Sequence, residues 1–248
     1  MISNSDASAI VRLLGNTAAV EGSFSDKKRF LMNGLCELIN ADAWIWSLGT
    51  WGEISKSPVY VGIMHGGFDE ERFAKLLQVI EHPHNDKIVA PWIEEVTRQK
   101  RHSTYSLQDL DVAGLFSDSE VADLMEQADI GELFVSGYPV DESSMSAIAV
   151  YRTSGAVQFN ARELKIAHLL FKEIRWLHSA GWSQQMTAKA PKLYPRQRVV
   201  LNLLLDGLGR KQIGSEMALT ENTVAGYIKD IYKHFEVSSH AQLMSKFL

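Results

Sequence analysis

A polar and basic row of side chains near the C-terminus has the spacing that contact with a nucleic acid requires. Asn222, Gly226, Lys229 and Lys233 recur every three to four residues, so they fall on one face of a helix. Lysine ammonium groups pair with phosphates and guanine edges, and an asparagine amide pairs with adenine. These residue types therefore indicate a helix that lies in the major groove of double-stranded DNA.

A different face of the same segment is apolar and must be buried. Val224, Ile228, Ile231 and Phe235 repeat at i, i+4, i+7 and i+11, which makes one continuous stripe. Thr220 stands just before the stripe, where an N-cap hydroxyl accepts from an N–H of the first turn. The pattern predicts a helix from residue 221 to about residue 235.

Short helices are predicted on both sides of this segment. Pro195 suits the first turn of a helix over 196–206, and Gly207 ends it. A second helix is expected over 210–217, and Ser239 caps a last one. Two helices, a short turn, a third helix and a supporting helix make a helix-turn-helix arrangement.

The same region resembles the DNA-binding domain of the LuxR/GerE regulators along its whole length, about a quarter of the chain. The matching landmarks keep fixed spacings: Leu193, Pro195, Arg196, Arg198, Val200, Leu201, Gly207, Lys211, Ile213, Thr223, Val224, Ile231, Phe235, Val237, Ser239, Ala241 and Leu243. The resemblance implies an all-α helix-turn-helix domain over 193–248 with double-stranded DNA as its partner. A helical piece that serves dimerisation only is the alternative. The expected DNA-binding residues are Lys211, Thr220, Asn222, Thr223, Ala225, Gly226, Tyr227, Lys229 and Lys233.

The sequence departs from the usual LuxR/GerE pattern at five positions. Tyr194 replaces a capping Ser or Thr, Gln197 replaces a Glu, and Gly214 replaces an Ala. Ala225 stands where Lys or Arg is common, and Tyr227 where His is common. The last two changes remove a cationic contact from the DNA-facing side of the helix.

Lys229 is then the basic residue best placed to reach bases, and we expect modest base-specific readout. Gly226 costs about 1 kcal/mol against Ala inside a helix. Close approach of the backbone to DNA explains its presence, and sequence drift is the alternative.

Composition indicates a folded protein outside the membrane. The chain has 248 residues, 46% hydrophobic and 22% charged, without an apolar run near the roughly 20 residues of a membrane span. One cysteine, Cys36, excludes an internal disulfide and a cysteine zinc cluster. No secretory signal pattern is visible at the N-terminus. These features predict a cytoplasmic location.

Charge is divided unevenly along the chain. From Ala190 onward there are eight basic and five acidic residues, a net charge of +3, and the preceding part carries −8. The C-terminal part is thus mildly basic and the front part acidic. So few cations predict that DNA binding needs a homodimer and weakens steeply with salt.

Residues 1–179 are predicted to form an α+β sensor domain, followed by a linker over 180–192. An antiparallel sheet flanked by helices is expected, and the order of elements resembles GAF/PAS-like sensor domains. Asn160 caps a long helix over 161–179, which forms a dimer spine or covers the sheet. The other expected elements are helices over 25–39 and after Asp69, and strands over 43–48, 57–64, 133–140 and 145–152.

The front domain is rich in aromatic residues, and four of them are candidates for a ligand pocket: Trp44, Trp46, Tyr60 and Trp92. Tyrosine and tryptophan combine a large apolar surface with a polar atom that needs a partner, as pocket linings do. The alternative is that they fill the core. The stretch from His82 to Asn85 reads as a surface loop rather than a metal site.

No catalytic constellation, metal site or cofactor motif is visible, so we do not expect an enzyme. The sequence predicts a DNA-binding regulator whose front domain senses a small-molecule ligand. A front domain that serves only protein interaction or dimerisation is the alternative. In both cases we expect a homodimer without membrane attachment.

Overall fold

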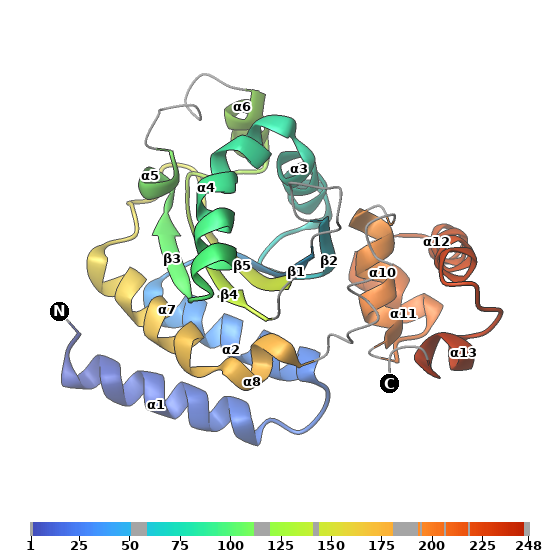
Figure 1. The fold of residues 1–248 in the computed structure, drawn as a ribbon, viewed down its shortest axis with the longest axis horizontal. Helices are drawn as coiled ribbons and strands as arrows, with labels where there is room; N and C mark the ends of the chain where they lie inside the picture. Colours follow the sequence, from blue (N-terminus) through green and yellow to red (C-terminus); the bar gives the residue numbers. More distant parts are fainter. Residues whose placement is uncertain are drawn as a thin grey trace. The chain divides into compact units, whose positions relative to one another are not determined.

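The computed structural model describes residues 2–50, 59–111, 120–140, 144–180, 193, 195–205, 207–217 and 219–245 (Figure 1). The chain divides into two compact units. Residues 1–46 and 65–180 form the first, and residues 47–64 and 181–248 form the second. Most of the expected linker over 180–192, the turn over 141–143 and Tyr194 lie outside the described residues.

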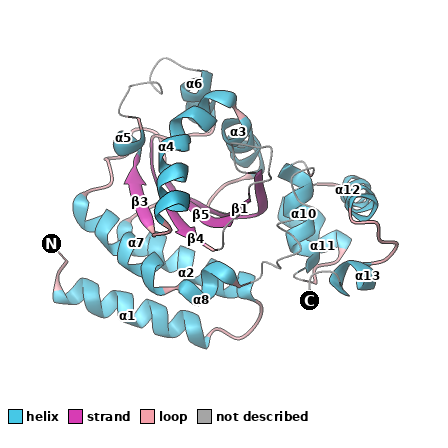
Figure 2. Cartoon of the chain, in the orientation of Figure 1, coloured by secondary structure: helices cyan, strands magenta, loops and turns pink. Residues whose placement is uncertain are grey.

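The part of the chain before residue 181, which we call the front part, contains a five-stranded antiparallel sheet with helices on both faces (Figure 2). The sequence predicts an antiparallel sheet flanked by helices, with four of these five strands. The strand order is β2-β1-β5-β4-β3. Strand β3 is not predicted from the sequence, because it has only four residues. Two of them are half-buried, so no alternation of buried and exposed residues marks the strand. The strands are β1 Ala43–Thr50, β2 Val59–Gly66, β3 Ser103–Ser106, β4 Glu132–Pro139 and β5 Ser144–Arg152.

Register fixes which side chains share a face of this sheet. Tyr138 of β4 pairs with Ser146 of β5, while the neighbouring Gly137 pairs with Ser103 of β3. Because successive residues of a strand point to opposite faces, Tyr138 and Gly137 face different layers. We call the Tyr138 side the first face and the Gly137 side the second face.

Different helices cover the two faces. Helices α2, α7 and α8 lie on the first face, and α4 lies on the second. The helices of the front part are α1 Asn4–Ala19, α2 Phe24–Ile39, α3 Glu70–Glu81, α4 Pro83–Gln99, α5 Leu107–Leu110, α6 Glu120–Gln127, α7 Ala161–Glu173 and α8 Arg175–Ser179.

Two expectations about these helices were wrong. The helix expected over 161–179 is interrupted at Ile174, whose φ of −92° and ψ of 35° leave the helical region, so α7 and α8 are separate. The stretch from His82 to Asn85 is not a loop. His82 caps α4 and Pro83 occupies its first turn, where the missing N–H of proline costs nothing.

A buried arginine joins the end of β5 to three other segments. Arg152 is 2% exposed, and its guanidinium donates to the carbonyls of Ile39 and Asn40 at the end of α2. It also donates to the carbonyl of Val157 and to Glu163 of α7 at 2.9 Å. Such a buried charge is tolerated because nearly every donor has an acceptor.

Helix α1, which the sequence analysis did not anticipate, is held to α7 by an ion pair. Arg162 donates from Nη2 and Nε to the two carboxylate oxygens of Asp6, at 2.5 and 3.1 Å. Asp6 also accepts from the Ser3 N–H in a capping box. The hydrogen bonds from Arg162 and Ser3 hold the pKa of Asp6 well below its ordinary value.

We predict that Asp6→Asn lowers the melting temperature at neutral pH and that this deficit shrinks under acid. A carboxyl whose pKa is lowered by folding stabilises the native state above its unfolded pKa of about 3.9, and this stabilisation is lost as the pH falls through the folded pKa. Melting followed by circular dichroism at neutral and strongly acidic pH measures the difference.

The control is Asp26→Asn, because Asp26 forms the same kind of capping box with Ser23 but has no guanidinium partner among the described residues. We expect its deficit to be the smaller. Equal deficits in the two variants at every pH would contradict the role given to Arg162.

Candidate nucleic-acid interface

Four helices form the described C-terminal part: α10 Pro195–Leu205, α11 Arg210–Met217, α12 Glu221–His234 and α13 His240–Ser245. They match the four helices expected from the sequence. Gly207, with a φ of +83°, ends α10, because this left-handed conformation suits glycine. Its N–H donates to the Leu204 carbonyl at 2.9 Å, and Leu208 N–H donates to Leu203 at 3.0 Å.

Helix α12 begins at the predicted cap. The Thr220 hydroxyl accepts from the Thr223 N–H at 3.2 Å and lies 2.9 Å from the Thr223 hydroxyl. Both residues are exposed. The two hydroxyls therefore order the N-terminal turn and remain accessible to a phosphate, which helix N-termini favour.

The apolar stripe of α12 is buried, as predicted. Val224 and Ile231 are fully buried, Ile228 is 5% exposed and Phe235 is 1% exposed. Contacts run from α12 to α10 and α11, whose core residues include Val200, Leu201, Leu204 and Ile213. Burying this stripe sets the rotation of α12 about its own axis and so determines which residues face solvent.

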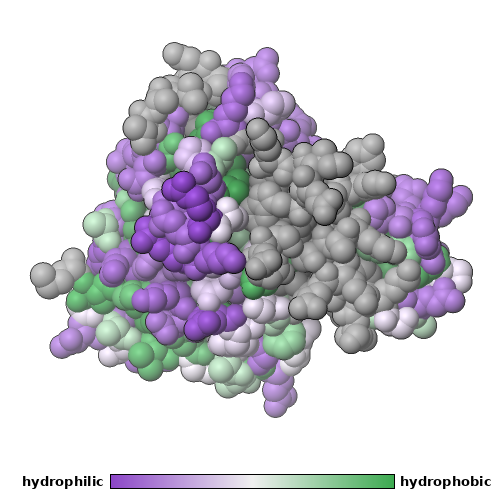
Figure 3. All heavy atoms as spheres, in the orientation of Figure 1, coloured by the Kyte–Doolittle hydropathy of each residue, from purple (hydrophilic) through white to green (hydrophobic). Residues whose placement is uncertain are grey.

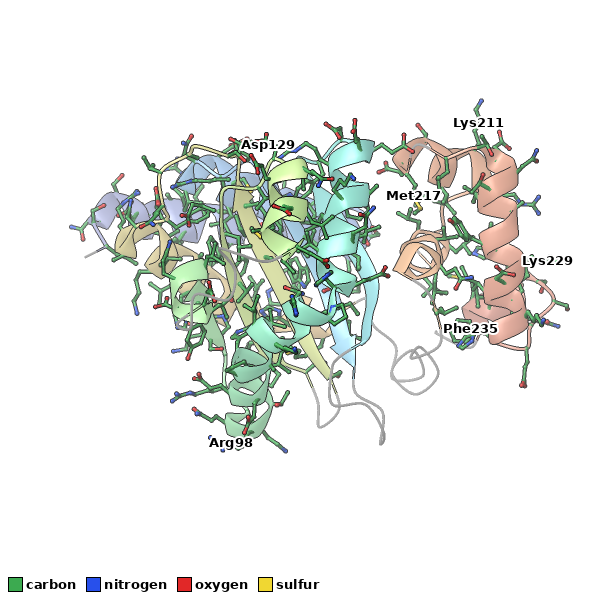
Figure 4. The ribbon with its side chains drawn as sticks, turned by 90° about the horizontal axis from the view of Figure 1, so that it is seen from above. Arg98, Asp129, Lys211, Met217, Lys229 and Phe235 are labelled. Carbon is green, nitrogen blue, oxygen red and sulfur yellow. The ribbon has the colours of Figure 1, made fainter. Side chains whose placement is uncertain are left out.

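The solvent-facing side of α12 carries the polar and basic row. Asn222, Gly226, Lys229 and Lys233 are exposed, and Ala225 and Tyr227 are half-buried beside them. Lys211 of α11 is exposed as well, and Figure 4 shows Lys211 and Lys229 projecting outward from their helices. Among the described residues, no hydrogen bond or ion pair engages Lys211, Lys229 or Lys233. We call the nine expected DNA-binding residues, Lys211, Thr220, Asn222, Thr223, Ala225, Gly226, Tyr227, Lys229 and Lys233, the reading face.

Gln197, where Glu is usual, has a matching partner. Its side chain is 7% exposed, and Nε2 donates to Asp230 of α12 at 3.2 Å. A glutamate at this position would set two carboxylates together, which disfavours their charged forms. The amide therefore suits the aspartate, and the pair ties α10 to α12.

Gly214, where Ala is usual, lies at a tight crossing between α11 and α12. Leu219 N–H donates to the Gly214 carbonyl at 2.8 Å, and a Cβ at position 214 would stand 2.8 Å from the Leu219 oxygen. Glycine therefore lets the turn close. Gly226 differs, because a Cβ there meets nothing within 4 Å.

The aromatic candidates of the front domain do not converge on one site. Trp44 Nε1 donates to Asn33 at 3.0 Å, and Trp46 Nε1 donates to Ser146 at 2.7 Å, on the first face. Trp92 lies on the second face, where its ring stands beside Gly137. The sheet thus separates Trp92 from Trp46. Tyr60 of β2 is half-buried.

A hydrogen-bond network that was not predicted from the sequence surrounds Trp46. Buried His178 lies 2.9 Å from the Ser146 hydroxyl through Nδ1, and its Nε2 lies 2.8 Å from the Phe171 carbonyl. Tyr138 stacks on His178 with ring centroids 4.4 Å apart. Burial lowers the pKa of His178 to about 3, so the ring is neutral near pH 7.

On the second face, two buried polar atoms lack a partner among the described residues: Trp92 Nε1 and Ser103 Oγ. Ser103 pairs in register with Gly137, the residue beside which Trp92 lies, so both atoms belong to the same part of the sheet. Buried polar groups are nearly always hydrogen-bonded in native proteins. The sequence pattern does not indicate Ser103, because the four residues of β3 are too few to show a strand alternation.

The described residues give no sign of a metal centre or a membrane span. Within them, His, Cys, Asp and Glu side chains do not gather in threes around a common point. Nor does any described helix combine the length and apolar character that crossing a bilayer requires.

Comparison with known proteins identifies the C-terminal region. Residues 191–247 match the family model described as bacterial regulatory proteins, luxR family. A comparison of the sequence with curated proteins finds no match.

Among solved structures, the chain is similar to Escherichia coli SdiA, with 13% identity, a TM-score of 0.50, and coverage of 96% of this chain and 95% of that chain. The LBD domain of VqsR from Pseudomonas aeruginosa is 14% identical and covers 71% of this chain and 95% of its own, with a TM-score of 0.47. The GAF3 domain of Slr1393 from Synechocystis is 17% identical, with a TM-score of 0.42 and coverage of 62% and 91%.

The family match falls on the helices that carry the buried stripe and the exposed reading face. The chain therefore carries, at residues 191–247, the DNA-binding helix-turn-helix domain of the luxR family of bacterial regulatory proteins.

Proposed function

We propose that the protein is a transcription regulator that binds a two-fold symmetric DNA site as a homodimer, under the control of a small ligand in its front domain. The observation that carries the DNA-binding part is the position of Lys229. It is exposed on α12, one turn beyond Gly226, on the helix whose opposite stripe is buried. The helix can therefore enter a groove without disturbing its own core.

In this proposal, some residues of the reading face contact the phosphates of the DNA backbone and others contact the bases. Thr220 and Thr223 at the helix start, together with Lys211 and Lys233, meet phosphates and set the register. Lys229 and Asn222 reach base edges, and Ala225 meets a thymine methyl group. This division explains how a helix with one well-placed base-reading cation still recognises a sequence.

Two copies supply the affinity that one copy lacks. The C-terminal part carries a charge of only +3, and each base contact contributes about 1–3 kcal/mol of discrimination. A dimer doubles the contacts and reads two half-sites about one helical turn apart.

Ligand sensing is supported by Trp92 and Ser103. A small molecule with a hydrogen-bond acceptor for the indole N–H and a donor or acceptor for the hydroxyl would satisfy both atoms. A ligand that binds the folded front domain and not the unfolded chain stabilises the folded domain. The free energy of this binding is available to regulate the protein. A ligand-free interaction module is the second candidate function, and the exposed apolar side chains of Phe30 and Trp176 favour it.

We predict that Lys229→Ala weakens binding to the DNA sequence that the wild-type protein selects from a random library. The loss of one base contact per copy should raise the Kd by at least about tenfold. Mobility shift at moderate salt measures this effect. The matched control is Lys87→Ala, an exposed lysine of α4, which should leave the Kd unchanged. Equal affinities of the Lys229→Ala and wild-type proteins would remove α12 as the reading helix.

Two glycines of neighbouring helices should respond in opposite ways to the same substitution. Gly226→Ala should slow hydrogen exchange of α12 amides, because Ala stabilises a helix by about 1 kcal/mol and the new methyl meets nothing. Gly214→Ala should speed exchange in α11 and α12, because its Cβ would press on the Leu219 oxygen. Exchange followed by mass spectrometry tests the pair, and a shift in the same direction would contradict this account.

The same Gly226→Ala variant tests close approach to DNA. If the backbone at Gly226 lies against the groove, the added methyl group weakens binding of the selected DNA even though the helix is more stable. Unchanged affinity would show that Gly226 has no role in contact.

We predict that Trp92→Phe abolishes ligand-induced stabilisation without lowering the stability of the free protein. Phenylalanine keeps most of the buried ring and removes the N–H that has no partner, so the free protein melts at the same or a higher temperature. Thermal melting with and without a dialysable extract of bacterial cells compares the two proteins. A wild-type protein that never shifts would favour the interaction module over the sensor.

A further inference from the structure

Helices α1 and α2 form a surface groove of about 520 Å³ that neither the reading face nor Trp92 uses. It is lined by one face of each helix, at spacings of three and four residues. Its apolar lining includes Leu13, Phe30 and Leu38, and Phe30 is 41% exposed. Figure 1 places α1 on the outside of the front unit, and Figure 3 shows apolar residues among the polar ones over this region.

The helices meet closely at the middle of the groove. A Cβ on Gly34 of α2 would stand 2.5 Å from a methyl carbon of Leu13 of α1, so these two residues lie at the same level. The loop between the helices has only four residues, 20–23, and the helices run in opposite directions. Arg12 on α1 therefore lies at about the level of residue 35 on α2, within one helical turn of Glu37.

Two opposite charges line the groove without partners. Arg12 comes from α1 and Glu37 from α2, and both side chains are exposed. Neither makes a hydrogen bond or an ion pair with any other residue that the structure describes. Two copies of this groove are therefore complementary to each other. The cation on α1 of each copy can meet the anion on α2 of the other, and the apolar linings can pack together.

We propose that this groove is the surface through which two copies of the chain associate. A two-fold axis along the groove sets α1 of each copy on α2 of the other. Arg12 of each copy then pairs with Glu37 of the other, which makes two identical ion pairs around an apolar centre, as an isologous interface requires. Each helix has 16 residues and is about 24 Å long, so the contact can extend over four turns.

This inference rests on the proposed function only in the need for two copies, and it adds the surface that joins them. Helix α7 does not provide that surface through its apolar side, because Ile166, Leu170 and Phe171 are buried within the front unit. The ion pair of Asp6 with Arg162 holds α1 on α7 and so fixes the helix that carries Arg12.

Charge reversal tests the proposal in the full-length protein. Arg12→Glu and Glu37→Arg should each raise the dimer Kd at least about tenfold, because like charges then meet at both symmetric pairs. The double variant, R12E with E37R, should return the Kd to near the wild-type value. Sedimentation velocity over a range of concentrations measures the Kd, and Lys87→Glu is the control for a change of charge alone.

Each outcome decides the matter. Rescue by the double variant supports the groove, whereas single variants that remain as dimeric as the wild type place the interface elsewhere. A wild-type chain that stays monomeric, or a double variant that fails to recover, also overturns the proposal. Binding of the selected DNA by the same variants is measured separately. Lys229→Ala should lose DNA binding and keep the dimer Kd of the wild type. Failure of the proposed DNA-reading helix can therefore be distinguished from failure of the proposed dimer surface.

Discussion

The burial of one stripe of α12 is the constraint on which the interface with DNA depends. Val224, Ile228, Ile231 and Phe235 lie in the core of the C-terminal helices, and this fixes the rotation of the helix. If α12 turned about its own axis by about 100°, the angle between successive residues, Lys229 would leave the exposed side of the helix. An apolar side chain of the stripe would then be exposed to solvent. The polar face can therefore vary for recognition, while the buried face cannot.

Two of the departures from the usual family pattern, Gln197 and Gly214, are compensated locally. Gln197 meets Asp230, so a change of charge on α10 matches a charge on α12. Gly214 allows the Leu219 carbonyl to approach, so the lost helix propensity of α11 is offset by the tight turn. No contact within the described residues requires glycine at position 226. Contact with DNA is the testable explanation for this glycine.

In the front unit, buried polar groups organise the layers. Arg152 binds the end of α2 and the start of α7 to β5, and the guanidinium of Arg162 binds α1 to α7. On the first face, Ser146 accepts from Trp46 and bonds His178, but His102 Nδ1 and Ser144 Oγ are buried without a partner among the described residues. On the second face, Trp92 Nε1 and Ser103 Oγ also lack partners among the described residues, and they are the pair that the proposed ligand would engage.

Features that depend on short spacings along the chain can be predicted from the residues alone. The stripe and cap of α12, the ends of α10 and the caps at Asp69 and Asn160 all follow from contacts within a few residues. The same reasoning predicted a strand over 43–48, where β1 lies. It missed β3 because four residues carry too little alternation, and it ran α7 and α8 together because nothing in the local sequence marks Ile174 as a break.

The three-dimensional fold establishes which distant residues share a site. It separated Trp92 from Trp44 and Trp46, brought Ser103 beside Gly137, paired Gln197 with Asp230, and set Arg12 and Glu37 in one groove. Strand order and helix packing join residues far apart in the chain, and no local period records those contacts. Local patterns fix the faces of each element, whereas long-range packing decides which faces meet.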